Sequence, residues 1–460
     1  MGKNNSTLDI NALGETSLQE RLSLVWKLSL PGILAQISEI AMQYIDAAMV
    51  GSLGAAASAS IGLVASSTWL MGGLIQGSAA GFYVQIAHSI GARDEKKARK
   101  ILHNGYAITG LVSLVLCLIG VILSRYLPIW LGGSQDIVSD ASAYFLCYAL
   151  FIPARMLFFY SAGSLQCTGN MKVPGIVSAL MCGLDVLFNA LLIFPSRYIG
   201  KVYVIGAGMG VAGAALGTAL AFVCAGIMLV TAVNLKSPVL RYRKEEEKKL
   251  DPAVLHEAVQ IGLPMALEQS AMSGAQAFST SIVAPLGTAA IAANSFAVTA
   301  EALCYMPGYG IQSASTANVG QAVGAKQNDL ARAFAWLTTA MGRSIMSVTG
   351  IAMYFLCPYV FMFLTPVEEV RKLGAEVLRI ELHAEPFFGA SIVAAGALRG
   401  AGDTLVPGLM NLVSIWGVRI VMAEILAPKM GLKGVWIAML CELIFRGTIF
   451  LVRLYRKRWV

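Results

Sequence analysis

The chain has 460 residues, of which 57% are hydrophobic and only 13% charged, with a mean hydropathy of +0.69 and a formal net charge of +8. This composition excludes a soluble globular protein and predicts a polytopic α-helical membrane protein, because apolar runs long enough to cross a bilayer recur along the whole chain. The positive charge does not indicate nucleic-acid binding, because the basic residues lie between the apolar runs, where they set membrane topology.

Residues 1–28 are predicted to form a cytoplasmic segment, of which 1–16 are expected to be disordered. Ser17 and Glu20 fit a capping box, in which a serine and a glutamate three residues later satisfy two free backbone N–H groups at a helix start. A short amphipathic helix is expected to begin there and to run into the first span. Because the N-terminus is polar and carries acids, we expect no cleavable signal peptide and predict that the first span is the targeting signal.

Hydropathy predicts twelve membrane-spanning helices. They are expected near residues 29–52, 57–84, 102–124, 140–166, 174–196, 206–234, 256–284, 287–318, 331–360, 374–398, 405–427 and 431–453. A charged linker, residues 235–255, divides them into an N-lobe of six helices (29–234) and a C-lobe of six (256–453), followed by a basic tail (454–460). Basic residues concentrate in the termini and in the loops after even-numbered spans, so the positive-inside rule predicts that both termini are cytoplasmic.

The two halves repeat in sequence at a constant offset of 233 residues. At this offset Pro31 aligns with Pro264, Gln36 with Gln269, Gln43 with Gln276, Gly91-Ala92 with Gly324-Ala325, Pro153 with Pro386, Gly169 with Gly402, and Pro174-Gly175 with Pro407-Gly408. Because each half has six spans, both enter the membrane in the same sense. The predicted fold is therefore an all-α polytopic membrane protein with twelve transmembrane helices in two pseudo-symmetric six-helix bundles around a central cavity.

The first predicted span carries a polar stripe. Gln36, Glu39, Gln43 and Asp46 are separated by three, four and three residues, which puts their side chains on one helical face. A carboxylate in the middle of a membrane costs about 2.5–3.5 kcal/mol on insertion scales, so it faces protein or water rather than lipid. We expect this face to line a polar cavity; a buried carboxylate that hydrogen-bonds a neighbouring helix is the alternative.

The repeat also shows where the halves differ. Asp46 aligns with Ser279, Glu39 with Met272 and Asp185 with Val418. The C-terminal half has acids of its own at other positions, namely Glu268, Glu301, Glu381 and Glu385. Such asymmetry suits a cation-coupled transporter that carries its coupling site in one lobe.

Several motifs, taken together and in this order, resemble the multidrug and toxic compound extrusion (MATE) family. They are Tyr44–Gly51 at the end of the first span, Gly91–Arg93 after the second, its repeat Val319–Lys326, Gln166–Asn170 and Leu398–Thr404 after the fourth and tenth, and Gly210–Thr218 at the start of the sixth. The resemblance covers about residues 20–455, nearly the whole chain.

The resemblance implies a twelve-helix antiporter that expels amphipathic, often cationic compounds in exchange for Na⁺ or H⁺. Matched position by position, it implies a coupling site in the N-lobe formed by Asp46, Asp185, Asn189 and Thr218. Many members carry Asn-x-x-x-Asp on the fifth span, whereas here the order is Asp185-x-x-x-Asn189. Both orders keep the two side chains on one helix face, but the exchange moves the charge by one turn.

The chemistry of these four residues is compatible with either Na⁺ or H⁺ as the coupling ion. The four residues supply the oxygen atoms that hard cations such as Na⁺ prefer. Two adjacent carboxylates in a low dielectric also resist joint ionisation, which suits an H⁺ carrier. We favour H⁺ over Na⁺, because only two fixed neutral ligands are identifiable; a purely structural helix contact is the third interpretation.

A second set of polar residues is predicted to line the substrate cavity: Gln36, Glu39, Gln43, Glu268, Gln269, Gln276, Glu301 and Glu385. The glutamines either bind substrate or join helices by hydrogen bonds. The acids Glu268, Glu301 and Glu385 either attract a cationic substrate or bond a buried partner such as Arg343, Arg379 or Arg419.

The sequence contains no nucleotide-binding loop, zinc motif or nucleophilic constellation, so we expect no enzyme and no cofactor beyond the coupling ion, H⁺ or Na⁺. The predicted function is a cation-coupled multidrug exporter. A flippase of lipid-linked precursors on a related two-lobed fold is the alternative, and a receptor or channel fits the repeat less well. The expected partners are amphipathic small molecules and the lipid bilayer, without nucleic acid, and the protein is expected to be a monomer.

Overall fold

The computed structural model describes residues 17–199, 202–241, 243, 250–456 and 459. The disorder expected for residues 1–16, and parts of the predicted linker and basic tail, lie outside these described residues. In chain order the elements are α1 (Leu18–Gly51), α2 (Ala55–Gly91), α3 (Glu95–Leu123), α4 (Leu127–Trp130), α5 (Gln135–Leu150), α6 (Ile152–Cys167), α7 (Lys172–Leu192), β1 (Pro195–Ile199), β2 (Val202–Ala207), α8 (Gly210–Thr231), η2 (Ala232–Lys236), α9 (Pro252–Val283), η3 (Ala284–Leu286), α10 (Thr288–Gly324), α11 (Asn328–Leu364), α12 (Glu368–Glu381), η4 (Leu382–Ala384), α13 (Glu385–Gly400), α14 (Leu405–Leu412), η5 (Val413–Ile420), α15 (Val421–Met430) and α16 (Leu432–Tyr455).

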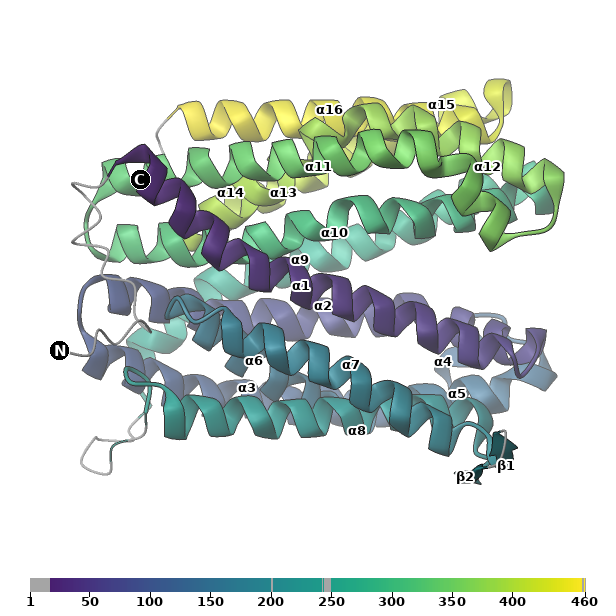
Figure 1. The fold of residues 1–460 in the computed structure, drawn as a ribbon, viewed down its shortest axis with the longest axis horizontal. Coiled ribbons are helices and arrows are strands. Elements are labelled where there is room, and N and C mark those ends of the chain that lie inside the picture. The colour runs from purple at the N-terminus through teal and green to yellow at the C-terminus, as the bar shows by residue number, and fades with distance from the viewer. Residues whose placement is uncertain (1–16, 200–201, 242, 244–249, 457–458, 460) are drawn as a thin grey trace. The chain divides into compact units, whose positions relative to one another are not determined.

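Each of the twelve predicted spans falls on one helix or on a run of consecutive helices (Figure 1). Within the described residues, eight helices are long and apolar enough to cross a membrane, or nine if α5 and α6, bent by 47°, count as one span. The α1, α9 and α12–α13 segments fall outside that set, and they carry most of the predicted site acids.

The start of α1 confirms the predicted capping box. The Ser17 backbone N–H donates to Glu20 Oε2 at 3.0 Å, and the Glu20 N–H donates to Ser17 Oγ at 3.3 Å. Because two otherwise free N–H groups are satisfied there, the helix begins at Leu18 and continues to Gly51 without a break.

The backbone repeats at the same offset as the sequence. The two non-glycine residues with positive φ in the described part of the chain are Arg93 (58°) and Lys326 (59°), which are 233 residues apart and follow equivalent helices. Two pairs of glycines with positive φ obey the same spacing, Gly54 with Gly287 and Gly169 with Gly402. The turns after equivalent helices therefore have the same geometry, which confirms the internal repeat.

Two compact units can be distinguished, and each is described by itself. Unit 1 comprises Ser38–Ile90 and Asp94–Ala266 among the described residues, so it takes the later part of α1, α2 to α8 and the first part of α9. Its core includes aromatic contacts: the Phe158 and Phe222 rings meet edge to face at 5.3 Å, and the fully buried Tyr160 meets Tyr106 edge to face at 4.9 Å.

Unit 2 comprises residues 17–37, Gly91–Arg93 and the chain from Leu267 onward. Figure 1 shows α10, α11 and α16 running lengthwise in this unit. Val25 of α1 is fully buried and belongs to the same hydrophobic cluster as Val319, Phe334 and Phe450.

The first part of α1 thus belongs to unit 2 and its later part to unit 1, whereas the first part of α9 belongs to unit 1 and its later part to unit 2. In unit 2, a Cβ on Gly32 of α1 would lie 2.7 Å from the backbone oxygen of Gly310 on α10. In unit 1, a Cβ on Gly77 of α2 would lie 2.8 Å from the backbone nitrogen of Ala266 on α9. Gly77 and Gly310 are equivalent in the repeat, so the same close helix contact, which only glycine permits, recurs in both units.

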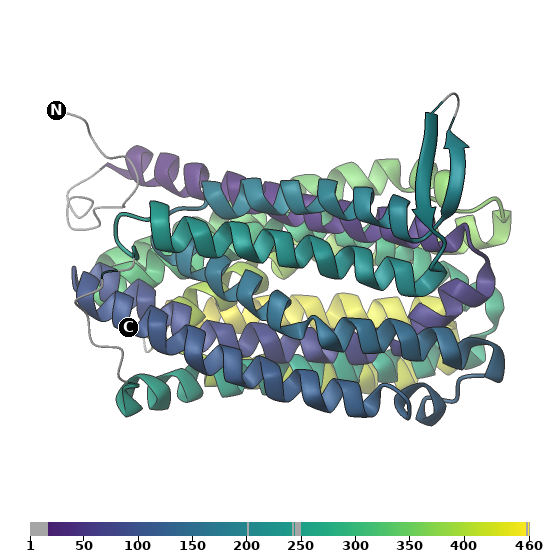
Figure 2. The same cartoon turned by 90° about the horizontal axis from the view of Figure 1, so that it is seen from below.

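Between α7 and α8 the chain forms a hairpin that hydropathy does not predict. Strands β1 and β2 pair antiparallel, from Pro195 opposite Ala207 to Ile199 opposite Val202. Figure 2 shows the hairpin standing across the direction of α7 and α8, at the ends of these helices.

Candidate functional site

Unit 1 brings together the four residues of the predicted coupling site. Asp46 lies in the last part of α1, Asp185 and Asn189 lie one turn apart on one face of α7, and Thr218 lies on α8. Asp185 and Asn189 are fully buried, whereas Asp46 and Thr218 are half-buried.

Small residues on α8 allow α7 to approach closely enough to form this cluster. A Cβ on Gly217 would overlap the Asn189 Oδ1 atom and would lie 3.0 Å from both the Asn189 Cγ and its backbone nitrogen. One turn earlier, a Cβ on Gly213 would lie 2.5 Å from the backbone oxygen of Leu192. The site therefore depends on a close helix contact of the small-xxx-small type.

Hydrogen bonds connect the four side chains. Asn189 Nδ2 donates to Asp46 Oδ1 at 2.6 Å and to Asp185 Oδ2 at 3.1 Å, so one amide bridges the two carboxyl groups. Thr218 Oγ1 donates to Asp46 Oδ2 at 3.4 Å. Carboxylate oxygens accept hydrogen bonds and the amide NH₂ group donates them, so the Asn189 amide must turn its nitrogen toward the two carboxyl groups.

Two oxygen atoms of this cluster remain without a hydrogen bond. Asp185 Oδ1 and Asn189 Oδ1 are buried and accept no hydrogen bond from any described residue. Buried polar atoms are normally paired, so an unpaired carboxylate oxygen beside a second carboxyl group has capacity left to bind a proton or a cation.

Two further residues interact electrostatically with the cluster and were not predicted from the sequence. Tyr144 on α5 is close enough to interact electrostatically with Asp46 and Asp185. Arg155 on α6 interacts in the same way with Asp185 and with Glu39, and its guanidinium lies 4.4 Å from the Tyr148 ring centroid. An arginine in the middle of a predicted span, 140–166, was the sequence signal that could have identified it.

The eight residues predicted to line a substrate cavity do not form one cluster in either unit. Gln36, Glu268, Gln269, Gln276, Glu301 and Glu385 belong to unit 2, whereas Glu39 and Gln43 belong to unit 1. Gln43 and Gln276 are exposed, and Gln36 and Gln269 are half-buried.

Glu268 is held in a buried polar contact. Its Oε1 accepts from Arg399 Nη2 at 2.8 Å and from Asn411 Nδ2 at 2.5 Å, and the residue is only 5% exposed. Arg399 was not among the partners considered from the sequence. Because it lies 131 residues away on α13, only the fold reveals the pair.

Arg343, Arg379 and Arg419, the partners that were considered, make other contacts. The Arg343 guanidinium lies 5.6 Å from the Phe387 ring centroid, and Arg379 Nε donates to the Tyr354 carbonyl oxygen at 3.2 Å. Arg419 Nη2 lies 2.8 Å from the Met439 sulfur.

Unit 2 also holds a group of buried carboxyl groups. Glu301, Glu381 and Glu385 are at most 3% exposed and lie close enough to affect one another's charge. No described residue donates a hydrogen bond to either carboxyl oxygen of Glu381 or Glu385. Glu442 lies near Glu301, but it is paired with Arg446 at 2.9 Å and accepts from Ser414 at 2.5 Å.

Comparison with protein families gives a match to the MatE family over residues 31–191 and 264–425. The two matched segments begin 233 residues apart, the offset found in the sequence and in the turns. The chain is also similar to the probable multidrug resistance protein NorM of Thermotoga maritima, with 27% identity over 98% of this chain and 95% of that protein. The multidrug resistance protein NorM of Burkholderia vietnamiensis is 25% identical over 94% of this chain and 93% of its own length.

Solved structures have the same fold. A transporter of the MOP superfamily from Pyrococcus furiosus superposes with a TM-score of 0.88 at 18% identity, over 95% of each chain. A point mutant of the Vibrio cholerae MATE transporter VcmN superposes with a TM-score of 0.87 at 18% identity, over 95% of this chain and 97% of its own. These similarities confirm the all-α, twelve-helix, two-bundle fold predicted from the sequence.

Proposed function

The chain belongs to the MatE family, and on this premise we propose that it is a cation-coupled antiporter that exports amphipathic, often cationic organic compounds. The chain is an integral, multi-pass membrane transporter and not an enzyme. Its NorM relatives are named as multidrug resistance proteins, which supports export of chemically diverse compounds as the function of this chain too.

The observation that carries the proposal is the Asp46–Asn189–Asp185–Thr218 cluster in unit 1. Two carboxyl groups share one amide donor, and one oxygen of Asp185 is buried without a partner. In a membrane protein, ionisable groups in such a position mark ion pathways, because their burial is costly unless they bind something. These four residues are therefore the proposed coupling site.

We propose H⁺ as the coupling ion, with Na⁺ as the alternative. Asn189 directs its Nδ2 to the two carboxyl groups, and its Oδ1 lies against Gly217. A Na⁺ ion needs oxygen ligands on several sides, so Asn189 would have to rotate before its oxygen could contribute. Proton binding needs only the carboxyl groups that are already adjacent.

The acids of unit 2 have two different proposed roles. Glu301 and Glu385 are candidates for attracting a cationic substrate, because Glu385 has no hydrogen-bond donor among the described residues and Glu301 lies near it. Glu268 is proposed to be structural, because Arg399 and Asn411 already satisfy one of its oxygens. Both termini are proposed to be cytoplasmic, and the two lobes of a monomer are proposed to alternate access to the substrate.

Purified protein in liposomes tests the proposal. Export of a fluorescent lipophilic cation is measured with an imposed pH gradient in the absence of Na⁺, and then with a Na⁺ gradient at equal pH. The expected result is uptake or export driven by the pH gradient alone. Transport that needs Na⁺ at constant pH would replace H⁺ by Na⁺, whereas movement of a lipid-linked pyrophosphate but not of the cation would favour the flippase alternative.

A further inference from the structure

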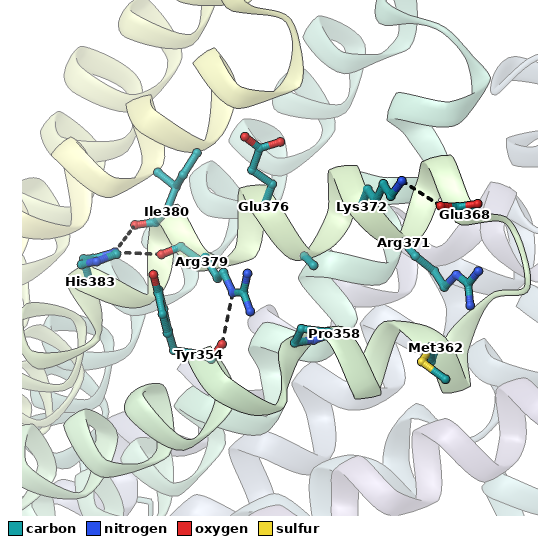
Figure 3. A pocket seen from close by; sticks show the side chains of 11 residues that line it. Tyr354, Pro358, Met362, Glu368, Arg371, Lys372, Glu376, Arg379, Ile380 and His383 are labelled. Atoms are coloured by element: carbon teal, nitrogen blue, oxygen red, sulfur yellow. Dashed lines mark hydrogen bonds and ion pairs between the residues drawn. The ribbon is translucent and has the colours of Figure 1, made fainter.

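Unit 2 carries a groove between α11 and α12, and none of the residues proposed for the coupling site or the substrate cavity lines it (Figure 3). Its volume is about 760 Å³. The α11 side is formed by Tyr354, Pro358 and Met362, and the α12 side includes Arg371 and Arg379. The groove lies where the ninth predicted span (331–360) ends and the tenth (374–398) begins, which is the level of the lipid headgroups.

The acidic residues of this groove are already paired with lysines. Glu368 lies 2.7 Å from Lys372, whose ammonium group holds the pKa of that carboxyl below its usual value. Glu376 lies 2.6 Å from Lys433 on α16. The positive charge that remains in the groove is therefore that of Arg371 and Arg379.

Both arginines are directed into the groove. Figure 3 shows their side chains extending from α12 toward α11, whereas Glu376 points the opposite way. Arg379 is fixed in this direction, because its Nε donates to the Tyr354 carbonyl oxygen at 3.2 Å and its guanidinium lies 5.2 Å from the Tyr354 ring centroid. Arg371 is half-buried and makes no ion pair or side-chain hydrogen bond within the described part of the chain. Guanidinium groups with free N–H donors match the geometry of a phosphate.

The groove continues into an apolar cavity of about 360 Å³, with which it shares Tyr354 and His383. Ile351 and Phe355 of α11 line this cavity opposite Leu382 and Pro386. Phe355 is 69% exposed and Phe363, near the end of α11, is 93% exposed. Large apolar side chains that are this exposed on a membrane-spanning helix face lipid, so the cavity opens toward acyl chains.

We propose that this groove binds one anionic phospholipid. Arg371 and Arg379 contact the phosphate of the headgroup, and one acyl chain lies in the apolar cavity beside Ile351 and Phe355. A basic pocket between transmembrane helices with an adjoining apolar channel fits both ends of such a molecule, and it fits neither a free phosphate nor a neutral lipid as well.

Native mass spectrometry of the purified full chain tests this proposal. The protein is titrated with phosphatidylglycerol and, in parallel, with phosphatidylcholine. The double variant Arg371→Gln/Arg379→Gln is expected to bind phosphatidylglycerol about tenfold more weakly than the wild type, because two charge-assisted contacts are lost. Lys429→Gln, at an exposed lysine of α15 outside the groove, removes a positive charge of the same unit and is expected to bind as the wild type does.

Further measurements distinguish a lipid from other ligands. Ile351→Trp, which fills the apolar cavity, is expected to weaken phosphatidylglycerol binding while both arginines remain. Arg371→Gln alone breaks no ion pair or side-chain hydrogen bond among the described residues, so a loss of lipid binding at an unchanged melting temperature is attributed to the missing guanidinium group. The proposal is overturned if the double arginine variant retains phosphatidylglycerol, if phosphatidylcholine binds the wild type equally well, or if inorganic phosphate at millimolar concentration displaces the lipid.

Discussion

Gly217→Ala is expected to disrupt the coupling site without changing any polar side chain. The added methyl group would overlap Asn189 Oδ1 and lie 3.0 Å from the Asn189 Cγ. The Asn189 Oδ1 atom must therefore withdraw by about 1.4 Å to reach an ordinary van der Waals distance. The bond of Asn189 to Asp46, now 2.6 Å, would then exceed the 3.5 Å limit of a hydrogen bond.

The loss can be estimated from the bond that is broken. A hydrogen bond to a charged group contributes about 1.5–3 kcal/mol, which corresponds to a decrease of about tenfold to a hundredfold in the population of the assembled site. We expect coupled efflux to fall by that factor while expression and insertion stay normal. The assay is accumulation of a lipophilic cation in everted membrane vesicles, normalised to the amount of transporter.

Gly183→Ala is the matched control. It adds the same methyl group to α7, the helix that carries Asp185 and Asn189, but no atom lies within 4 Å of the new position. The double variant Gly217→Ala/Asn189→Ala removes the side-chain atoms that clash and leaves only the 3.0 Å contact with the backbone nitrogen, so it should transport about as well as Asn189→Ala alone. Wild-type efflux in Gly217→Ala, an equal loss in Gly183→Ala, or a further loss in the double variant would refute the reasoning.

Four other single substitutions test the remaining features of the two units. Asp46→Asn is expected to abolish coupled efflux at normal expression, because one of the two carboxyl groups of the site is removed; wild-type rates in everted vesicles would contradict this role. Thr218→Ala should retain substantial efflux driven by a pH gradient, since only the carboxyl groups bind the proton, and Asn189→Ala should retain as much as Gly217→Ala does, because both lose the same hydrogen bond to Asp46. Na⁺-dependent efflux that vanishes in Asn189→Ala would instead indicate a Na⁺ site. Glu268→Gln should lower the thermal stability in detergent by the equivalent of about 3–5 kcal/mol, because Arg399 loses its buried partner, and Glu268→Gln/Arg399→Gln should recover most of it. A double variant as unstable as the single would show that the pair is not coupled.

Nine of the twelve helical segments were predictable as long apolar runs, whereas α1, α9 and the α12–α13 segment are less apolar. The repeat was predictable because it lies in the sequence itself. The cluster of Asp46, Asp185, Asn189 and Thr218 was identified for two reasons. The motif resemblance supplied all four positions, and the four-residue spacing puts Asp185 and Asn189 on one helix face. The spacing of residues along one helix and the order of the motifs were sufficient to predict this cluster.

Features that depend on packing between distant segments were not predictable. The partner of Glu268 is 131 residues away, and any of several intramembrane arginines was compatible with the sequence. Arg155 is separated from Glu39 by more than a hundred residues, so hydropathy marks it as unusual without indicating its neighbour. The hairpin from Pro195 to Ala207 was hidden because its ends overlap the apolar edges of two predicted spans.

The division of α1 and α9 between the units bears on how such a chain could have arisen. A polypeptide limited to residues 29–234 would lack Pro252–Ala266, the part of α9 that meets Gly77, so its own unit would be incomplete. A single ancestral copy with one set of six helices could fill that place only by receiving the first helix of a second copy. Reciprocal exchange of one element between identical chains is domain swapping, and it makes a pair of chains the smallest complete assembly. In such a pair each partner would make the same contact, which is the relation that the equivalent glycines Gly77 and Gly310 have within this one chain.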